Sequence, residues 1–210
     1  MKRRRMAVDV AMTALLPCLM AYSLIGETFH EAAGVAMLAL FIGHHVLNRG
    51  WLKGLFRGRY TPYRIVQTIV DLLLCVVMVS LPLSGILMSK HLFLFLPVTG
   101  LAATARTVHL LAAYWGFLLM SFHLGLHLER MLKKRSPWMM IAAAAVSLYG
   151  VTVLFRRDIL DYLFLRSRFV FFDPSASLSL FILDYISVMV LFAGIGCRIG
   201  QLLKGRRGTV

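Results

Sequence analysis

The chain has 210 residues, of which 60% are hydrophobic and only 15% are charged, and its formal net charge is +14. Soluble domains carry about a quarter charged residues, whereas the mean hydropathy of this chain is +0.79. Composition therefore excludes an ordinary soluble enzyme domain and indicates an integral membrane protein.

Six apolar segments are long enough to cross a bilayer, which takes about 20 residues each. They cover about residues 7–26, 29–48, 63–88, 103–127, 138–155 and 177–200. The first follows a basic N-terminus, as in a signal peptide, but its apolar run is too long and lacks a small-residue cleavage site, so we expect a retained span. Without repeats or linkers, residues 1–210 are expected to form a single all-α domain.

The basic residues follow the positive-inside pattern. With the N-terminus inside, 17 of the 23 Lys and Arg residues fall in the inner segments. The outer loops keep Lys90, Arg106, Arg156, Arg157, Arg166 and Arg168. This asymmetry predicts a multi-pass protein of the bacterial inner membrane with both termini in the cytoplasm. Its basic inner surface suits membrane lipid with acidic headgroups, and nucleic acid is not an expected partner.

The longest outer stretch, residues 156–176, is rich in aromatic side chains. Tyr162, Phe164, Phe169, Phe171 and Phe172 suit a segment that lies at the membrane interface. Pro174 would end any helix there.

Four histidines form two pairs with equal separation, since His30 and His44 lie fourteen residues apart, as do His109 and His123. At 100° per residue, fourteen steps return to within about 40° of the starting direction, so each pair shares one helix face. Along the axis the members of a pair lie about 21 Å apart. Both segments run from outside to inside, so His30 and His109 are the outer histidines and His44 and His123 the inner ones.

This arrangement predicts two stacked b-type haems, ligated by His30 and His109 at the outer level and by His44 and His123 at the inner level. Two axial histidines leave no open position at iron, which suits electron transfer. No Cys-x-x-Cys-His sequence occurs, so covalent c-type attachment is excluded. The predicted fold is an integral membrane six-helix bundle with a dihaem four-helix core.

Other histidines leave alternatives open. His45 competes with His44 but points about 100° away around the helix, and the equal spacing favours His44. His127 lies eighteen residues after His109, about 27 Å along the axis, and the second segment has no partner at that separation. We expect His127 at the interface or beside a propionate, and His91 on the surface of an outer loop.

Haem propionates need cationic or hydrogen-bonding partners where the pocket meets the headgroups. Candidates are Arg106 and Lys90 at the outer haem, and Arg49, Trp51, Lys53 and Arg59 at the inner haem. Topogenic charge and interface anchoring explain each of these residues equally well.

Carboxylates at membrane depth are also unusual. Asp71 and Asp184 lie within segments, Asp9 lies near the start of the first, and Glu27 and Glu31 flank His30. Each could orient a ligand imidazole, accept a proton beside a quinol, or form a structural pair with an arginine or a hydroxyl group. The sequence leaves these three roles open.

Several runs resemble the flavinylation-associated cytochrome family, namely residues 26–34, 43–51, 164–173 and 183–185. The broader pattern is similar to the membrane cytochrome subunits of formate dehydrogenase and to the cytochrome b core. The resemblance implies a small membrane cytochrome b that passes electrons between the quinone pool, or other membrane donors, and an extracytoplasmic redox protein bearing flavin or haem. It also implies ligand roles for the two histidine pairs.

The expected function is therefore transmembrane electron transfer through two haem b groups, with quinone as a further candidate cofactor and no catalytic residue assigned. One alternative is a ferric or flavin-linked reductase fed from the cytoplasm. The other is a haem-free transporter or assembly factor, for which polar, broken helices are expected and these segments show few.

Overall fold

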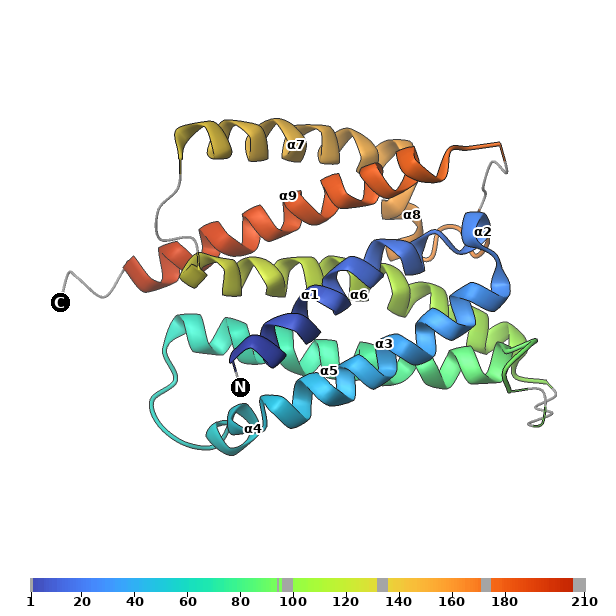
Figure 1. Ribbon diagram of the computed structural model, residues 1–210, viewed down its shortest axis with the longest axis horizontal. Coiled ribbons are helices and arrows are strands. Elements are labelled where there is room, and N and C mark those ends of the chain that lie inside the picture. Colours follow the sequence, from blue (N-terminus) through green and yellow to red (C-terminus); the bar gives the residue numbers. More distant parts are fainter. Residues whose placement is uncertain (1, 94, 96–99, 132–135, 171–174, 206–210) are drawn as a thin grey trace.

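The computed structural model describes residues 2–93, 95, 100–131, 136–170 and 175–205, whose regular secondary structure is helical throughout. The long helices are α1 (Lys2–Met20), α3 (Glu27–Leu47), α5 (Pro62–Met88), α6 (Ala102–Met131), α7 (Pro137–Arg156) and α9 (Leu178–Gly205). The short helices are α2 (Tyr22–Ile25), α4 (Gly50–Gly54) and α8 (Ile159–Leu163). The start of α1, α4 and the end of α9 lie at one end of the bundle, and α2 and α8 lie at the other (Figure 1).

Five helices are long and apolar enough to cross a membrane, namely α3, α5, α6, α7 and α9. They match the last five predicted segments to within a few residues, which confirms the all-helical class and indicates a multi-pass membrane protein. The first predicted segment, 7–26, is divided between α1 and α2 and ends at Gly26, whose φ is 88°. Because the first turns of α1 carry a run of cations and Asp9, α1 is not among the five apolar helices. The sixth span stays a prediction.

Local sequence explains where two of these helices begin. The Thr61 side chain accepts a hydrogen bond from the Arg64 backbone N–H at 3.3 Å, and Pro62 occupies the first helical position of α5. Ser136 and Pro137 hold the corresponding positions of α7. At α7 the Ser136 side chain makes no capping hydrogen bond, so proline at the first helical position, where no backbone N–H is needed for an intrahelical bond, is the signal that both starts share.

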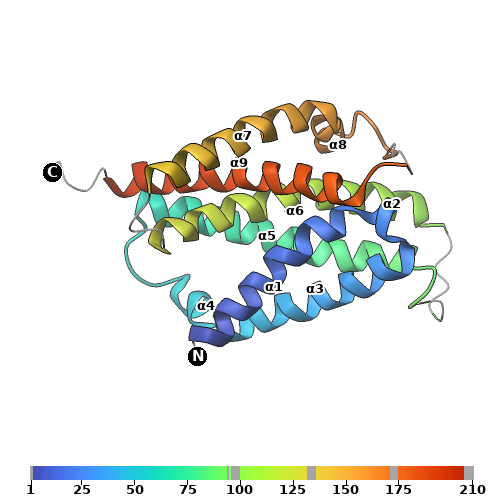
Figure 2. The same ribbon diagram turned by 45° about the horizontal axis from the view of Figure 1, so that its top comes forward.

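Helix α6 lies at the centre of the bundle, between α5 and α9 (Figures 1 and 2). Helix α7 packs on α9 at the periphery, whereas α3 contacts α1 and α5. The core is formed by side chains that are almost fully buried, among them Phe117, Leu126, Val153, Tyr185 and Val188. The two helices that carry the paired histidines, α3 and α6, run in the same direction, as the topology predicts (Figure 1).

Small residues permit the close approach of α6 and α9. A Cβ atom at Gly196 would collide with the Phe122 carbonyl oxygen, and one at Gly125 would collide with that of Ala193. Backbone contacts of this kind are typical of membrane helices, which associate through close packing.

We expect Gly196→Ala to lower the free energy of unfolding by about 1–3 kcal/mol, as overpacking in a dense interior does. Gly194→Ala is the matched control on the same helix, because a Cβ atom there would meet only Ser147 Oγ, at 3.9 Å. Unfolding of both variants in detergent micelles, followed by circular dichroism, measures the difference. Equal stability of the two variants would contradict the close contact.

The outer stretch 156–176 is partly helical. Tyr162 of α8 is buried and stacks on Tyr114 of α6, with ring centroids 4.7 Å apart. Phe164 and Phe169 are exposed, as expected of an interfacial segment. Phe171, Phe172 and Pro174 lie outside the described residues.

Candidate functional site

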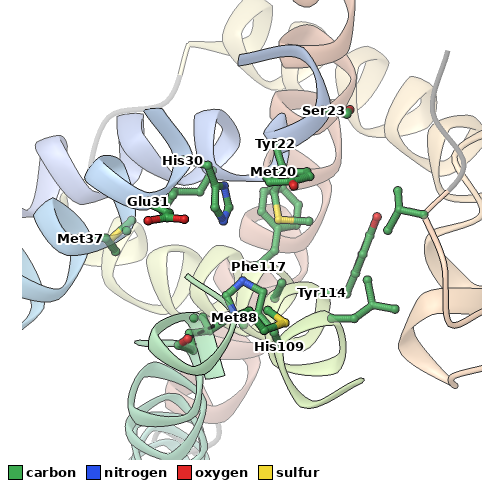
Figure 3. Close-up of a pocket in the computed structure, with 18 of the residues that line it drawn as sticks. Met20, Tyr22, Ser23, His30, Glu31, Met37, Met88, His109, Tyr114 and Phe117 are labelled. Carbon is green, nitrogen blue, oxygen red and sulfur yellow. Dashed lines mark hydrogen bonds between the residues drawn. The ribbon is translucent and has the colours of Figure 1, made fainter. Parts of the chain in front are cut away.

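A cavity of about 620 Å³ lies inside the bundle toward the end that carries α2 and α8. Its walls come from α1, α3, α5, α6 and α9, with contributions from α2 and the outer loops. Apolar side chains such as Met37, Met78 and Phe117 line much of it. Two histidines, His30 from α3 and His109 from α6, face each other across it (Figure 3).

The separation of these two rings matches what a single iron between them would require. Their centroids are 6.1 Å apart and their planes are inclined by 66°. A metal–imidazole bond of about 2 Å and about 1 Å from ring nitrogen to ring centre put the centroids of two axial rings roughly 6 Å apart. The outer pair predicted from the sequence is therefore brought together.

Hydrogen bonding orients His109. Its Nδ1 lies 3.2 Å from the Leu81 carbonyl oxygen and 3.0 Å from Ser84 Oγ. Because a carbonyl can only accept, Nδ1–H is the donor to Leu81, and Nε2 keeps the lone pair that a metal needs. Gly85 makes room for the ring, since a Cβ atom there would lie 3.7 Å from His109 Cε1.

Hydrogen bonds orient the His30 ring less than they orient the His109 ring. Its Nδ1 is buried and has no hydrogen-bond partner among the described residues. The Tyr22 ring packs edge-on against His30, with centroids 5.1 Å apart. Because an unpaired buried nitrogen is costly, this atom is consistent with a site built for a bound group.

Basic side chains gather where the cavity opens. Predicted partners Lys90 and Arg106 both line it, and so do Arg156, Arg157 and Arg168. Lys90 is also paired with Glu27, its Nζ lying 2.8 Å from Oε1. From the sequence, the three arginines were expected only as outer-loop charges, because they lie far from the histidines along the chain.

Glu31 anchors the outer loop that follows α5. Its carboxylate accepts hydrogen bonds from Ser89 Oγ at 2.7 Å and from the backbone N–H groups of Lys90 and Leu92, each at 2.9 Å. These bonds tie α3 to the loop before α6. Of the roles considered for Glu31, this geometry favours the structural one.

The inner histidines are arranged differently. Among the described residues, ring contacts join His44 to His45 and His123 to His127, at 5.5 and 4.5 Å, but do not join His44 to His123. Neither His44 nor His123 lines the larger cavity. The pairing of His44 with His123 stays a prediction.

Each inner histidine instead meets a carboxylate from a neighbouring helix. His44 Nδ1 donates to Asp9 Oδ1 of α1 at 2.8 Å. His123 Nδ1 lies 2.8 Å from Asp71 Oδ1 of α5, although the two atoms are not aligned as a hydrogen bond. The sequence analysis considered both aspartates as orienting groups but could not say which histidine each would meet.

Helix α3 places the competing residue His45 against α5. His45 Nδ1 donates to the Phe41 carbonyl at 3.1 Å, and its Nε2 lies 3.6 Å from Cys75 Sγ. Both ring nitrogens of His45 are thus engaged, which favours His44 as the residue available to a metal.

The candidate propionate partners at the inner end lie on the surface. Arg49, Lys53 and Arg59 are exposed. Trp51 of α4 lines a smaller cavity of about 280 Å³ between α4 and the start of α5. Tyr63, in the first turn of α5, also lines it. Neither inner histidine lines this cavity, and the propionate roles of Arg49, Trp51, Lys53 and Arg59 stay predictions.

Asp184 forms a buried ion-pair cluster. Its side chain is 2% exposed and contacts Arg156 and Arg157, with Arg157 Nε and Nη2 at 2.9 and 2.7 Å from Oδ2. Tyr149 donates to its Oδ1 at 2.7 Å. The cluster joins α7 to α9, so Asp184 has the structural role that was one of its alternatives.

No group of three or more His, Cys, Asp and Glu side chains suited to a metal ion occurs in the part of the chain that the structure describes. This absence concerns metal sites that take at least three ligands from protein side chains. Haem iron takes only two ligands from the protein, and His30 and His109 fit that demand.

Fold and site together define a helical protein with five helices suited to a membrane and an internal cavity between two facing histidines. No protein-family model, curated protein or solved structure matches the chain. The similarity to flavinylation-associated cytochromes and to formate dehydrogenase cytochrome subunits therefore stays a prediction from its motifs.

Proposed function

We propose that this chain is a membrane cytochrome b that carries electrons across a bilayer through two bis-histidine haems. The observation that carries the proposal is the outer pair: the His30 and His109 rings lie 6.1 Å apart at a cavity of about 620 Å³. Imidazoles from two separate helices, facing each other within apolar walls, suit axial ligation of a low-spin haem.

Support for the inner haem is of another kind. His44 and His123 follow the outer histidines at the same separation on two helices that run in the same direction (Figure 1). Both Nδ1 atoms lie 2.8 Å from a carboxylate oxygen, and at His44 this contact is a hydrogen bond that leaves Nε2 as the nitrogen for a metal. We assign the inner haem to these two residues.

The residues of the chain would position the cofactor and shield it from water. Leu81 and Ser84 orient His109, while Met37 and Phe117 contribute apolar wall. Arg106, which lines the cavity, would neutralise a propionate. A haem b bound there would supply reversible one-electron chemistry, and the protein would set its position and potential.

We further propose the quinone pool as electron donor and an extracytoplasmic protein bearing flavin or haem as acceptor, in a bacterial inner membrane with both chain ends cytoplasmic. The resemblance to flavinylation-associated cytochromes supports these two redox partners, and the excess of inner basic residues supports the cytoplasmic position of the chain ends. Since Asp184 is ion-paired and Glu31 binds a loop, neither is assigned as the acceptor of a quinol proton.

Spectroscopy of the purified protein tests the proposal. In mild detergent, from cells well supplied with iron, the protein should be red, with a low-spin haem b difference spectrum and two haems per chain by pyridine haemochrome assay. Reduction by a quinol but not by a soluble nicotinamide-flavin donor would distinguish it from a reductase fed from the cytoplasm. A colourless protein would contradict the proposal and favour a haem-free transporter or assembly factor.

A pair of adjacent substitutions tests the inner ligand. We expect His44→Ala to lower haem content from two to about one per chain, and His45→Ala to leave it at two, because both nitrogens of His45 are already engaged. The haemochrome assay measures both variants, each serving as the control for the other. Loss of haem from the His45 variant alone would reverse the assignment.

A further inference from the structure

The segment that joins α3 to α5, residues 48–61, contains α4 and lies at the end of the bundle where α9 also ends (Figure 1). Both flanking helices are long and apolar enough to cross a membrane. A short connection between two such helices stays at the membrane surface, so the side chains of this segment meet lipid headgroups.

The segment carries positive charge with no carboxylate near it in the sequence, since residues 32–70 include neither Asp nor Glu. Its exposed cations are Arg49, Lys53, Arg57 and Arg59. None of the four forms an ion pair with another residue that the structure describes. Uncompensated cations beside a bilayer attract anionic lipid, and each Lys or Arg adds to the attraction.

Apolar side chains of the same segment are exposed as well. Phe56 is 91% exposed and Leu52 is 62% exposed, and Trp51 is half-buried. Large apolar side chains interleaved with cations are typical of segments that lie in the plane of the headgroups, with the apolar groups against the acyl chains. The segment therefore suits a partner with both a charged and an apolar part, which a soluble anion lacks.

Arg64, in the first turn of α5, fixes the shape of this segment. Its Nη1 donates to the Arg59 carbonyl at 3.3 Å and its Nη2 to the Gly54 carbonyl at 2.5 Å. The guanidinium also stacks over the Tyr60 ring, 4.3 Å from the centroid, and the Tyr60 hydroxyl donates to the Leu55 carbonyl. An ordered loop presents the cations, which lowers the entropic cost of binding a ligand.

The cavity of about 280 Å³ between α4 and α5 offers a place for a headgroup. Its polar lining comes from Trp51, Arg64, Gln67 and Thr68. Indole, guanidinium, amide and hydroxyl groups all supply hydrogen-bond donors, whereas the oxygens of a phosphodiester can only accept. Because hydrogen bonds to an anionic oxygen are the stronger ones, this lining is suited to a phosphate group.

We propose that the segment and this cavity bind the headgroup of an anionic phospholipid. The phosphodiester lies at the donors of the cavity, and the acyl chains lie along Leu52 and Phe56. A zwitterionic lipid brings its own ammonium group and leaves the four cations uncompensated, so the site prefers a lipid of net negative charge. The proposal requires the chain to sit in a bilayer but does not rest on the haem assignment.

Quenching by brominated lipids tests the preference in the full-length protein. The chain has three tryptophans, so replacing Trp115 and Trp138 by phenylalanine leaves Trp51 as the only one. This protein is reconstituted in phosphatidylcholine vesicles that contain a rising fraction of brominated phosphatidylglycerol or brominated phosphatidylcholine. Half of the Trp51 quenching should need at least fivefold less of the glycerol lipid. Equal quenching by the two lipids would overturn the proposal.

Charge variants in the same background show which cations act. Arg57→Gln should weaken the preference for phosphatidylglycerol about fivefold, the effect of one basic residue at an anionic surface, and Arg57→Lys should retain it. Arg166→Gln is the matched control, because Arg166 is an exposed cation at α8, at the other end of the bundle. An unchanged preference in Arg57→Gln, or an equal loss in Arg166→Gln, would contradict a site at this segment.

Uncharged variants separate a bounded site from diffuse attraction. Gln67→Leu combined with Thr68→Val removes two donors of the cavity without changing the charge, and should raise the fraction of phosphatidylglycerol needed about tenfold, as loss of hydrogen bonds to a charged group does. If only the charge variants had an effect, the cavity would not be the site. Relief of the quenching by inorganic phosphate in solution would identify a soluble anion and overturn the lipid assignment.

Haem content, measured on the same preparations, keeps this proposal distinct from the proposed function. Arg57→Gln should contain as much haem as its parent. A colourless protein that still prefers phosphatidylglycerol would refute the haem assignment and leave the lipid site standing. Two haems per chain without any lipid preference would do the reverse.

Discussion

His109→Ala is expected to lower the haem content of the purified protein from two to about one per chain. His109 supplies one of the two imidazoles that face each other at the outer cavity, and its Nδ1 contacts with Leu81 and Ser84 hold the ring in place. Without it, His30 has no opposing ligand. The haemochrome assay gives the stoichiometry.

The surface histidine His91 provides the matched control. It lies in the outer loop near the same end of the bundle, and its side chain is 42% exposed beside Glu27. His91→Ala should retain two haems. Addition of free imidazole to His109→Gly should restore part of the lost haem, since the cavity left by the side chain can hold the missing ligand. Two haems in His109→Ala would refute the outer ligand assignment.

The second large effect is expected at Asp184, where Asp184→Asn should reduce the free energy of unfolding by about 3–5 kcal/mol. The carboxylate is 2% exposed and holds two arginines, so its removal leaves cationic groups without compensation. The single oxygen that asparagine retains could accept from Tyr149, but the amide would not compensate the arginine charges. Unfolding in detergent micelles by an added denaturing detergent measures the change.

An exposed ion pair at α8 serves as the control for Asp184. Asp161 and Arg166 lie 3.7 Å apart with side chains 44% and 73% exposed, so Asp161→Asn should cost less than about 1 kcal/mol. Combining Asp184→Asn with Arg157→Met should recover part of the lost stability, because the buried charge is then removed with its partner. If Asp184→Asn were as stable as the wild type, the cluster would not hold α7 to α9.

Helix positions could be predicted from the sequence because the signals are local. Apolar runs of bilayer length mark α3, α5, α6, α7 and α9, and hydroxyl–proline pairs at 61–62 and 136–137 mark two starts. The division of the first segment was not predicted. It depends on a break after Met20 and on the positive φ of Gly26, which an apolar run does not reveal.

The candidate site was predictable only in part. The equal spacing of the four histidines indicated that each pair shares one face of its helix. In the structure, the rings of His30 and His109 lie close together. Spacing could not show that His45 is engaged by Phe41 and Cys75. It also could not show that Arg157 lines the cavity while bound to Asp184.

The sequence by itself determined the helical membrane class, the approximate ends of five spans and the shared direction of α3 and α6, since these follow from runs, caps and alternation across a bilayer. Only the tertiary structure decided which helices are in contact and how each helix is rotated about its own axis. That rotation depends on close contacts such as Gly125 with Ala193 and Gly196 with Phe122, whose partners lie far apart in the chain. For the same reason, only folding could assign Asp9 to His44 and Asp71 to His123.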